Sequence, residues 1–397
     1  FEASGWNTQS VDGHDAEAVA AAITAAQKSD KPSLIACKTT IGFGSPNKAG
    51  TSATHGSPLG EEEVAATRKA LGWNHPAFEI PKEILHEWRG AGTRGQTEYQ
   101  AWKKRLESFG KEAEFTQRMS DGLSDGWQQA LEKFKQELAK EQPKEATRKS
   151  SGRVLEALGD TLPELVGGSA DLTGSNLTKT KAQQPVTKDD YSGRYIYWGI
   201  REHGMAAAMN GLALHGGFVP YGGTFMVFTD YCRPAIRLAA LMQQRVIYVM
   251  THDSIGLGED GPTHQPVEHL PALRAMPNLN VFRPADATET LECWALALAS
   301  NKTPSILSLS RQNLPSVRKE YTEQNLCAKG AYVLADAKDA RATLIATGSE
   351  VEIALKAQSL LAEKGIAAKV VSMPCWELFA QQPTQYQQEV LGTGVRV

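Results

Sequence analysis

Near the start of the chain, the order of apolar and polar positions predicts a helix followed by a strand. In HDAEAVAAAITAAQKS, residues 14–29, apolar residues recur on one helical face, and Asp15 is suited to cap the N-terminus. The run PSLIACKTT, residues 32–40, is short and apolar, which is typical of a buried strand. A helix leading into a strand indicates an α/β layer. The loop that follows, residues 41–60, is long and rich in Gly, Ser, Thr and Pro, which favours a functional loop.

The pattern then becomes polar and helical from about residue 61 to residue 150. Lys, Glu and Gln dominate WQQALEKFKQELAKEQPKEATRK, residues 127–149. We interpret this stretch as a connecting segment on the surface, with a solvated face, and expect Pro143 to end a helix.

A second α/β region is predicted between about residues 151 and 320. Short apolar runs alternate there with helical stretches at 202–214 and 286–299. The runs are ELVGGSA (164–170), YIYWGI (195–200), RVIYVMTH (245–252), NVFRP (280–284) and SILSLSR (305–311). Strands that alternate with helices favour a parallel sheet.

A third α/β unit is predicted from about residue 330. ATLIATGSE (342–350) and AAKVVSMP (367–374) flank an apolar helix at 351–364. We therefore predict an α/β protein, with parallel sheets flanked by helices in successive domains. It starts at Phe1 without a Met and stops at VLGTGVRV, which resembles a strand just beginning, so we expect a fragment cut at both ends.

Composition narrows the function classes. The 397 residues suffice for two or three domains, and 41% hydrophobic with 22% charged residues is ordinary for a globular protein. A net charge of −3 argues against a nucleic-acid partner, and no apolar run is long enough for a membrane span. The five cysteines are scattered without a C-x-x-C pair, which is typical of reduced thiols in a cytoplasmic protein.

The loop THDSIGLGEDGPTHQ, residues 251–265, concentrates candidate chemistry. Its G-x-G-x-x-G spacing matches a dinucleotide fingerprint, but Pro262 directly follows the last glycine and the expected acid is absent from residues 270–282. His252 and His264 lack the spacing of a helical metal-binding pair. The loop follows an apolar strand, and such loops bind ligands in open α/β sheets, so we expect an oxygen-rich ligand such as a sugar or phosphate.

Several segments, taken together and in this order, resemble the transketolase family. They are KTTIGFGSPNKAG…HGSPLG (38–60), TRKSSG (147–152), GGSADLTGSNLT (167–178), YSGRYIYWGIREHGM (191–205), YGGTFMVFTDY (221–231), THDSIGLGEDGPTHQP (251–266) and SLSRQNLP (308–315). The resemblance implies a thiamine diphosphate-binding fold. It divides the chain into part of the diphosphate-binding domain with connecting helices (1–112), a pyrimidine-binding domain with a leading linker helix (113–321) and an incomplete C-terminal α/β domain (322–397).

The same resemblance implies a function. It predicts transfer of a two-carbon ketol unit from a ketose phosphate, such as xylulose 5-phosphate, to an aldose phosphate, such as ribose 5-phosphate, through a thiamine diphosphate enamine in the pentose phosphate pathway. It also implies a cytoplasmic homodimer with its active site at the subunit interface. Mg²⁺ or Ca²⁺ would accompany the cofactor. Its ligands are expected in a G-D-G…N segment upstream of Phe1, so none is assigned in this chain.

Residue roles carry over at matching positions. The resemblance implies catalytic roles for Glu202, His55 and His264, with Glu202 hydrogen-bonded to the pyrimidine ring. The cofactor-binding set is Phe228, Phe225, Tyr231, His55 and Glu202; the substrate-binding set is Arg148, Ser175, His252, Asp260, His264 and Arg311. Asp171 matches a position near the cofactor. Aromatic residues spaced three apart are more often core, so that interpretation of Phe225 and Tyr231 stays open.

The same segments bear on alternatives to transketolase. Dihydroxyacetone synthase is a close relative that passes the ketol unit to formaldehyde, and it stays open. The more distant 1-deoxyxylulose-5-phosphate synthase is disfavoured, because the full set of transketolase-like segments is present. The chain could instead be a fragment or split subunit, inactive without the missing N-terminal segment.

Overall fold

The computed structural model describes residues 1–120, 122–392 and 394–397. The chain divides into two compact units, Phe1–Arg105 and Leu106–Val397. None of the described helices is long and apolar enough to span a membrane.

The first unit contains a small parallel sheet. Strand β1 (Asn7–Asp12) pairs with β2 (Ser33–Lys38), and α1 (Ala16–Ala26) connects them. The Asp15 carboxylate accepts hydrogen bonds from the backbone amides of Glu17 and Ala18 at 3.0 and 3.1 Å, as its predicted capping role requires. The remaining elements are η1 (Glu2–Ser4), η2 (Ser52–Thr54), α2 (Glu61–Ala70), α3 (Lys82–Thr93) and α4 (Gln96–Phe109), which runs past the end of the unit.

The expected burial of the strand in residues 32–40 is wrong. The strand forms, but the residues of β2 are half-buried or exposed. The physical reason is that, among the described residues, β2 pairs only with β1, in a sheet of two strands.

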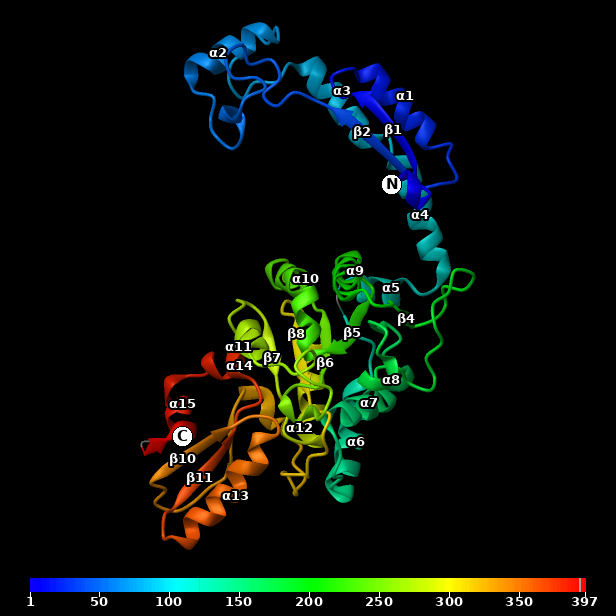
Figure 1. The fold of residues 1–397 in the computed structure, drawn as a ribbon. Helices are drawn as coiled ribbons and strands as arrows, with labels where there is room; N and C mark the ends of the chain where they lie inside the picture. Colours follow the sequence, from blue (N-terminus) through cyan, green and yellow to red (C-terminus); the bar gives the residue numbers. More distant parts are fainter. Residues whose placement is uncertain (121, 393) are drawn as a thin grey trace. The chain divides into compact units, whose positions relative to one another are not determined.

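The second unit is built around a six-stranded parallel sheet with the order β4-β3-β5-β6-β8-β7 (Figure 1). Its strands are β3 (Leu165–Ser169), β4 (Tyr195–Tyr197), β5 (Val219–Phe225), β6 (Ile247–Thr251), β7 (Asn280–Phe282) and β8 (Ser305–Leu309). The predicted parallel sheet is thus confirmed. β5 and the helix after it, α10 (Thr229–Leu241), were not predicted.

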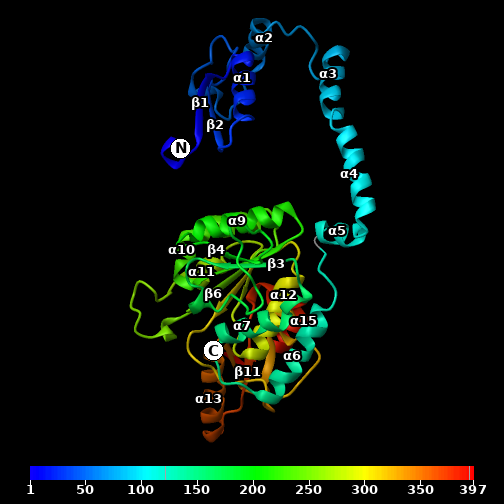
Figure 2. The same ribbon diagram turned by 90° about the vertical axis from the view of Figure 1, so that its right-hand side faces the viewer.

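Helices cover both faces of this sheet. In Figure 2, α9 (Glu202–His215) and α10 lie on one side, and α7 (Thr147–Leu158) and α12 (Ala287–Ala299) on the other. Side chains alternate between the two cores along β6: Ile247 and Val249 join one cluster, Tyr248 and Met250 the other. The shorter elements are α5 (Glu112–Met119), η3 (Gly159–Thr161), α8 (Thr173–Asn176), η4 (Met226–Phe228), η5 (Ile255–Leu257) and α11 (His269–Arg274).

Helix α6 (Trp127–Glu141) corrects the expected surface segment. It ends before Pro143 as predicted, but its apolar face, with Leu131 and Phe134, is buried in the core shared with α7 and α12. The abundant Lys, Glu and Gln occupy mainly the opposite face, so composition concealed an amphipathic helix. Even Lys135 is buried, where its Nζ lies 2.8 Å from the Glu292 carboxylate.

The last part of the chain forms a four-stranded sheet with the order β12-β10-β11-β9. Its elements are η6 (Leu326–Lys329), β9 (Tyr332–Ala335), β10 (Ala342–Ala346), α13 (Glu350–Glu363), β11 (Ala368–Ser372), α14 (Trp376–Ala380), α15 (Thr384–Leu391) and β12 (Val395–Arg396). β9 is antiparallel to β11, and the other pairings are parallel. All five cysteines of the chain are free thiols, and four of them are buried.

Candidate active site at the carboxyl edge of the sheet

The candidate residues of the second unit gather where the parallel strands end. Phe225 is the last residue of β5, His252 follows β6 directly, and Arg311 lies two residues beyond β8. Ser175 lies on α8, which follows β3, and Glu202 begins α9 after β4. Because the carboxyl ends of parallel strands meet at one edge, segments far apart in the sequence converge there.

Aromatic rings form the centre of this edge. The Phe225 ring stacks on the His252 imidazole with centroids 3.8 Å apart, and on Phe228 at 5.6 Å. His264 meets both phenyl rings edge-on, at 5.8 and 5.4 Å. Tyr231 lies 6.0 Å from Phe228 and is 64% exposed, whereas Phe225 is buried. Phe225 therefore serves as a buried support, while Phe228 and Tyr231 are accessible.

A pocket of about 550 Å³ adjoins these rings. It is lined by Ala170, Asp171, Leu172, Ile200, Glu202, Phe228 and Tyr231. Glu202 is buried in the first turn of α9, where the helix dipole favours an acidic group. Nearby, burial and then the charge of Glu202 raise the pKa of the Cys232 thiol to about 12, so this cysteine is not a nucleophile. The pocket is an apolar slot with acidic groups at its wall.

Two arginines form a cationic region beside the rings. Arg148, in the first turn of α7, donates from Nη1 to the backbone oxygen of Ser175 at 2.6 Å. Burial, followed by repulsion from Arg311, lowers the pKa of Arg148. Two guanidiniums that repel each other and offer planar sets of donors are suited to a shared anionic ligand such as a phosphate.

His252 is neutral and held in place by a chain of hydrogen bonds. Burial, and then the positive charge of Arg148, lower the pKa of His252 to about 4. Its φ of 60° is left-handed, which is uncommon outside glycine and typical of functional sites. Its Nδ1 lies 2.8 Å from Thr251 Oγ1, and this hydroxyl oxygen accepts a hydrogen bond from Asn176 Nδ2 at 2.8 Å.

This series of hydrogen bonds continues to Ser169, whose hydroxyl donates to Asn176 Oδ1 at 2.8 Å. This bond orients the amide so that its NH₂ group faces Thr251, and the Thr251 hydroxyl hydrogen can then donate to His252 Nδ1. The arrangement favours the tautomer of neutral His252 that carries its proton on Nε2. The sequence did not predict roles for Ser169, Asn176 and Thr251, because small polar residues of these types are common at the ends of strands and helices.

The loop after β6 brings the remaining candidates to the same edge. Asp260 is exposed, and its charge acts on His252. His264 is half-buried, with Nδ1 2.9 Å from Thr263 Oγ1. Gly258 has a φ of 107°, which strains any other residue, and an added Cβ there would lie 3.7 Å from Arg311 Nη1. The loop thus lies alongside the cationic region.

His55 belongs to the other unit. It is exposed and follows η2 in the long Gly-, Ser- and Thr-rich loop of Phe1–Arg105. All the other sequence-predicted site residues lie within Leu106–Val397.

Protein-family comparisons match nearly the whole chain in three segments. Residues 1–126 match the transketolase thiamine diphosphate binding domain, residues 144–317 the transketolase pyrimidine binding domain, and residues 330–397 the transketolase-like C-terminal domain.

Individual relatives agree. A curated transketolase from Cereibacter sphaeroides is 56% identical over 100% of this chain and 60% of its own length. A solved transketolase from Leishmania mexicana is 41% identical with a TM-score of 0.88, again over 100% of this chain and 60% of that one. A structure described as a split gene transketolase, inactive beta4 tetramer, is 28% identical with a TM-score of 0.53 and covers 64% of this chain and 80% of its own. The chain thus spans about 60% of the curated relative's length.

Proposed function

Because this chain belongs to the transketolase family, we propose that it takes part in moving a two-carbon ketol unit from a ketose phosphate to an aldose phosphate. One observation supports this most strongly. An apolar pocket with acidic groups in its wall lies at the same edge of the sheet as the two arginines. The loop that follows β6 carries Asp260 and His264. This arrangement provides separate places for a heterocyclic ring, a sugar and a phosphate.

The pocket residues fit the pyrimidine ring of thiamine diphosphate. Phe228 would stack on the ring and Tyr231 would cover its edge, while the buried Glu202 would hydrogen-bond a ring nitrogen. When bound, the cofactor supplies a carbon centre that stabilises the carbanion of the transferred unit. For its part Glu202 would hold a proton at the ring, and the phenyl wall would keep water away.

The cationic region would bind the sugar phosphate. Arg148 and Arg311 offer fork-shaped donor groups, Ser175 a hydroxyl, and neutral His252 an Nε2–H donor. Asp260 would accept a hydrogen bond from one substrate hydroxyl and so select its stereochemistry. His264, against Phe225 and Phe228, would exchange a proton with the substrate oxygen nearest the cofactor. A catalytic and cofactor-binding role for His55 is part of the same proposal.

Further parts of the proposal concern the assembly. Mg²⁺ or Ca²⁺ would bind with the cofactor diphosphate, and no residue of this chain is assigned to it. The active protein would be a cytoplasmic homodimer with its site at the subunit interface, in the pentose phosphate pathway. The domain limits 1–112, 113–321 and 322–397 are part of the same proposal.

Replacing the pocket acid tests this function. Glu202→Gln keeps the shape of the side chain but removes the exchangeable carboxyl proton, so ketol transfer from xylulose 5-phosphate to ribose 5-phosphate should fall at least ~100-fold. Glu259→Gln, at an exposed acid in the loop after β6, is the matched control and should leave turnover unchanged. Near-normal turnover of Glu202→Gln would sink the assignment.

A second candidate is a subunit that supplies only part of an active site. It is favoured by the similarity to the split gene transketolase. Calorimetric titration of the chain with thiamine diphosphate and Mg²⁺ separates the two. Binding and turnover by the chain alone support the first candidate. Binding that appears only after adding a polypeptide with the part of the relatives that this chain does not cover supports the second. Transfer to formaldehyde rather than ribose 5-phosphate would indicate a dihydroxyacetone synthase instead.

A further inference from the structure

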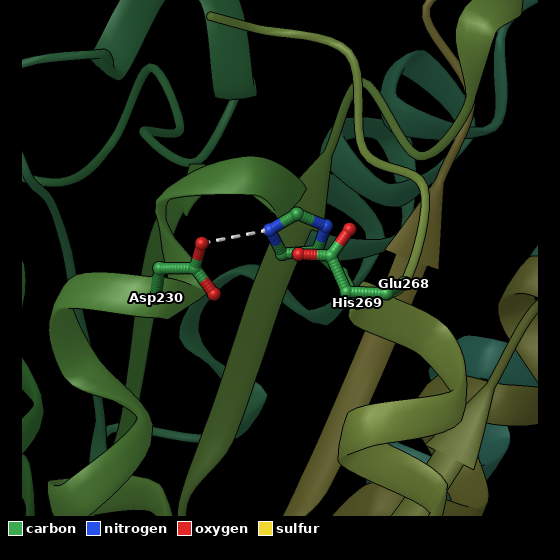
Figure 3. Close-up of side chains that lie close together, drawn as sticks. All are labelled: Asp230, Glu268 and His269. Atoms are coloured by element: carbon green, nitrogen blue, oxygen red, sulfur yellow. Dashed lines mark ion pairs between the residues drawn. The ribbon is translucent and has the colours of Figure 1, made fainter.

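A second cluster of metal-ligating side chains lies outside the residues assigned to ketol transfer. Asp230 is in the first turn of α10, Glu268 immediately precedes α11, and His269 is the first residue of α11. One ligand atom from each of the three lies within 4.8 Å of the others. Figure 3 shows both carboxylates beside the imidazole ring of His269. From this cluster we propose a binding site for a divalent transition-metal ion of the Zn²⁺ type, linking α10 to α11.

The state of His269 is the first argument. Its side chain is only 4% exposed, and neither ring nitrogen has a hydrogen-bond partner among the described residues. Nε2 lies 3.2 Å from Asp230 Oδ2, which would be an ion pair if the ring were protonated (Figure 3), yet the two atoms do not form a hydrogen bond. Buried polar groups in native proteins are nearly always partnered, because an orphaned one is costly. A metal ion that accepts the Nε2 lone pair would give this ring nitrogen the partner it lacks.

The spacing of the ligand atoms is the second argument. Two ligands that each lie 2.0–2.1 Å from a tetrahedral zinc ion are separated by about 3.3 Å. The 3.2 Å between His269 Nε2 and Asp230 Oδ2 matches this separation. An ion can therefore bridge these two atoms in their present positions. Glu268 offers a third ligand atom, within 4.8 Å of the ligand atoms of the other two residues.

The surroundings hold the Asp230 carboxylate in a suitable orientation. Arg233 Nη2 donates to Oδ1 at 3.0 Å, which leaves Oδ2 directed toward His269. Such contacts to a ligand's outer atoms are a common feature of metal sites. With one arginine beside two carboxylates, the cluster carries excess negative charge that a divalent cation would neutralise. Glu268 and Asp230 are exposed, so the ion can enter from solvent and keep water as a further ligand.

The ligand set indicates which metal binds. One imidazole nitrogen with two carboxylates suits zinc and neighbouring first-row ions. Ca²⁺ and Mg²⁺ prefer complete shells of oxygen atoms, which these three residues do not provide. The site therefore differs in its ligand chemistry from the cation expected with the cofactor diphosphate, for which no residue of this chain is assigned.

Zinc titration of the metal-free 397-residue chain against a chromophoric chelator tests the proposal. One equivalent of Zn²⁺ should bind, and an excess of Mg²⁺ should not displace it. His269→Gln, Asp230→Asn and Glu268→Gln should each weaken binding at least ~tenfold, since loss of even an outer contact has effects of that size. His215→Gln, at an exposed histidine that ends α9, is the control and should bind as the unmodified chain does.

Folding and ligand identity are checked separately. Glu268 is exposed, so Glu268→Gln should retain the circular dichroism of the unmodified chain even if a variant of buried His269 unfolds. X-ray absorption of the zinc-loaded chain should show one imidazole nitrogen with oxygen neighbours. Failure of the unmodified chain to bind Zn²⁺, equal binding by Glu268→Gln, or sulfur ligation from exposed Cys37 would each overturn the proposal.

Discussion

The hydroxyl of Thr251 lies 2.8 Å from Nδ1 of His252 while accepting a hydrogen bond from Asn176 at the same distance. This relationship favours the tautomer of neutral His252 that carries its proton on Nε2. It links the end of β6 to α8, so the orientation of the His252 ring depends on how these two elements pack.

Removing this hydroxyl should weaken phosphate binding selectively. Thr251→Val leaves His252 Nδ1 without its partner, so either tautomer can form. A net hydrogen bond contributes about 0.5–1.5 kcal/mol, which corresponds to a rise of roughly 3–10-fold in KM for phosphorylated sugars with little change in kcat. Steady-state kinetics with ribose 5-phosphate and with unphosphorylated ribose measures the difference. Thr251→Ser, which keeps the hydroxyl, should restore KM. An equal rise in KM for both variants would contradict a role for the hydrogen bond between Thr251 and His252.

Replacing Arg311 should raise the stability of the ligand-free chain but weaken the binding of an anionic ligand. Arg311→Ala removes a repulsive neighbour of Arg148, so the ligand-free chain should be slightly more stable. The same change removes a charged hydrogen-bond donor worth about 1.5–3 kcal/mol to a bound phosphate. Thermal unfolding with and without sugar phosphate detects both effects. Arg237→Ala, at an exposed arginine on α10, should change neither quantity, and a ligand-induced stabilisation that Arg311→Ala leaves intact would contradict the phosphate site.

His252 should make the chain less stable in acid. Its folded pKa of about 4 lies below the ordinary value of 6.5, so between these pH values the unfolded chain binds more protons. Stability from this group is complete above about pH 6.5 and is lost as the pH falls toward 4, by at most roughly 3 kcal/mol. Urea unfolding at several pH values measures the slope. His252→Gln should flatten that slope, and an unchanged slope would show that another group causes it.

Helix α6 should behave as core rather than as a surface connector. Lys135 is buried and lies 2.8 Å from Glu292, which also contacts Arg318 at 2.7 Å. Lys135→Ala removes this contact and packing, and breaking a buried pair costs about 3–5 kcal/mol. Lys133→Ala, on the exposed face of the same helix, should cost under ~0.5 kcal/mol. Urea denaturation compares the two, and equal small losses would support the surface interpretation.

The hydrophobic pattern predicted most of the parallel sheet but missed β5, the strand that ends at Phe225. β5 contains Pro220 and the pair Gly222–Gly223, which are poor strand signals. The structure gives a reason for Gly223, since a Cβ there would lie 3.0 Å from Asn176 Oδ1. A glycine at position 223 therefore leaves room for Asn176, whose amide contacts Thr251. The same glycine weakens the sequence pattern of the strand.

Tertiary context explains the other differences. Pro234 within α10 hid that helix, although the helix packs its apolar face against α9 and the sheet. The family resemblance predicts Arg148, Arg311 and His252 as substrate-binding residues. Only the structure shows that the two positive charges lower the pKa of the histidine. Hydroxyl and amide groups such as those of Thr251 and Asn176 are too common in sequences to be recognised before their distances are known.

Following labelled carbon tests the proposed ketol transfer most directly. The chain, in the form that binds thiamine diphosphate, is mixed with xylulose 5-phosphate carrying ¹³C at its first two carbons and with unlabelled ribose 5-phosphate. The account predicts, by ¹³C NMR, a seven-carbon ketose phosphate with both labels intact at its first two carbons. Cofactor binding without any labelled seven-carbon product, or a product in which the two labels are separated, would contradict it.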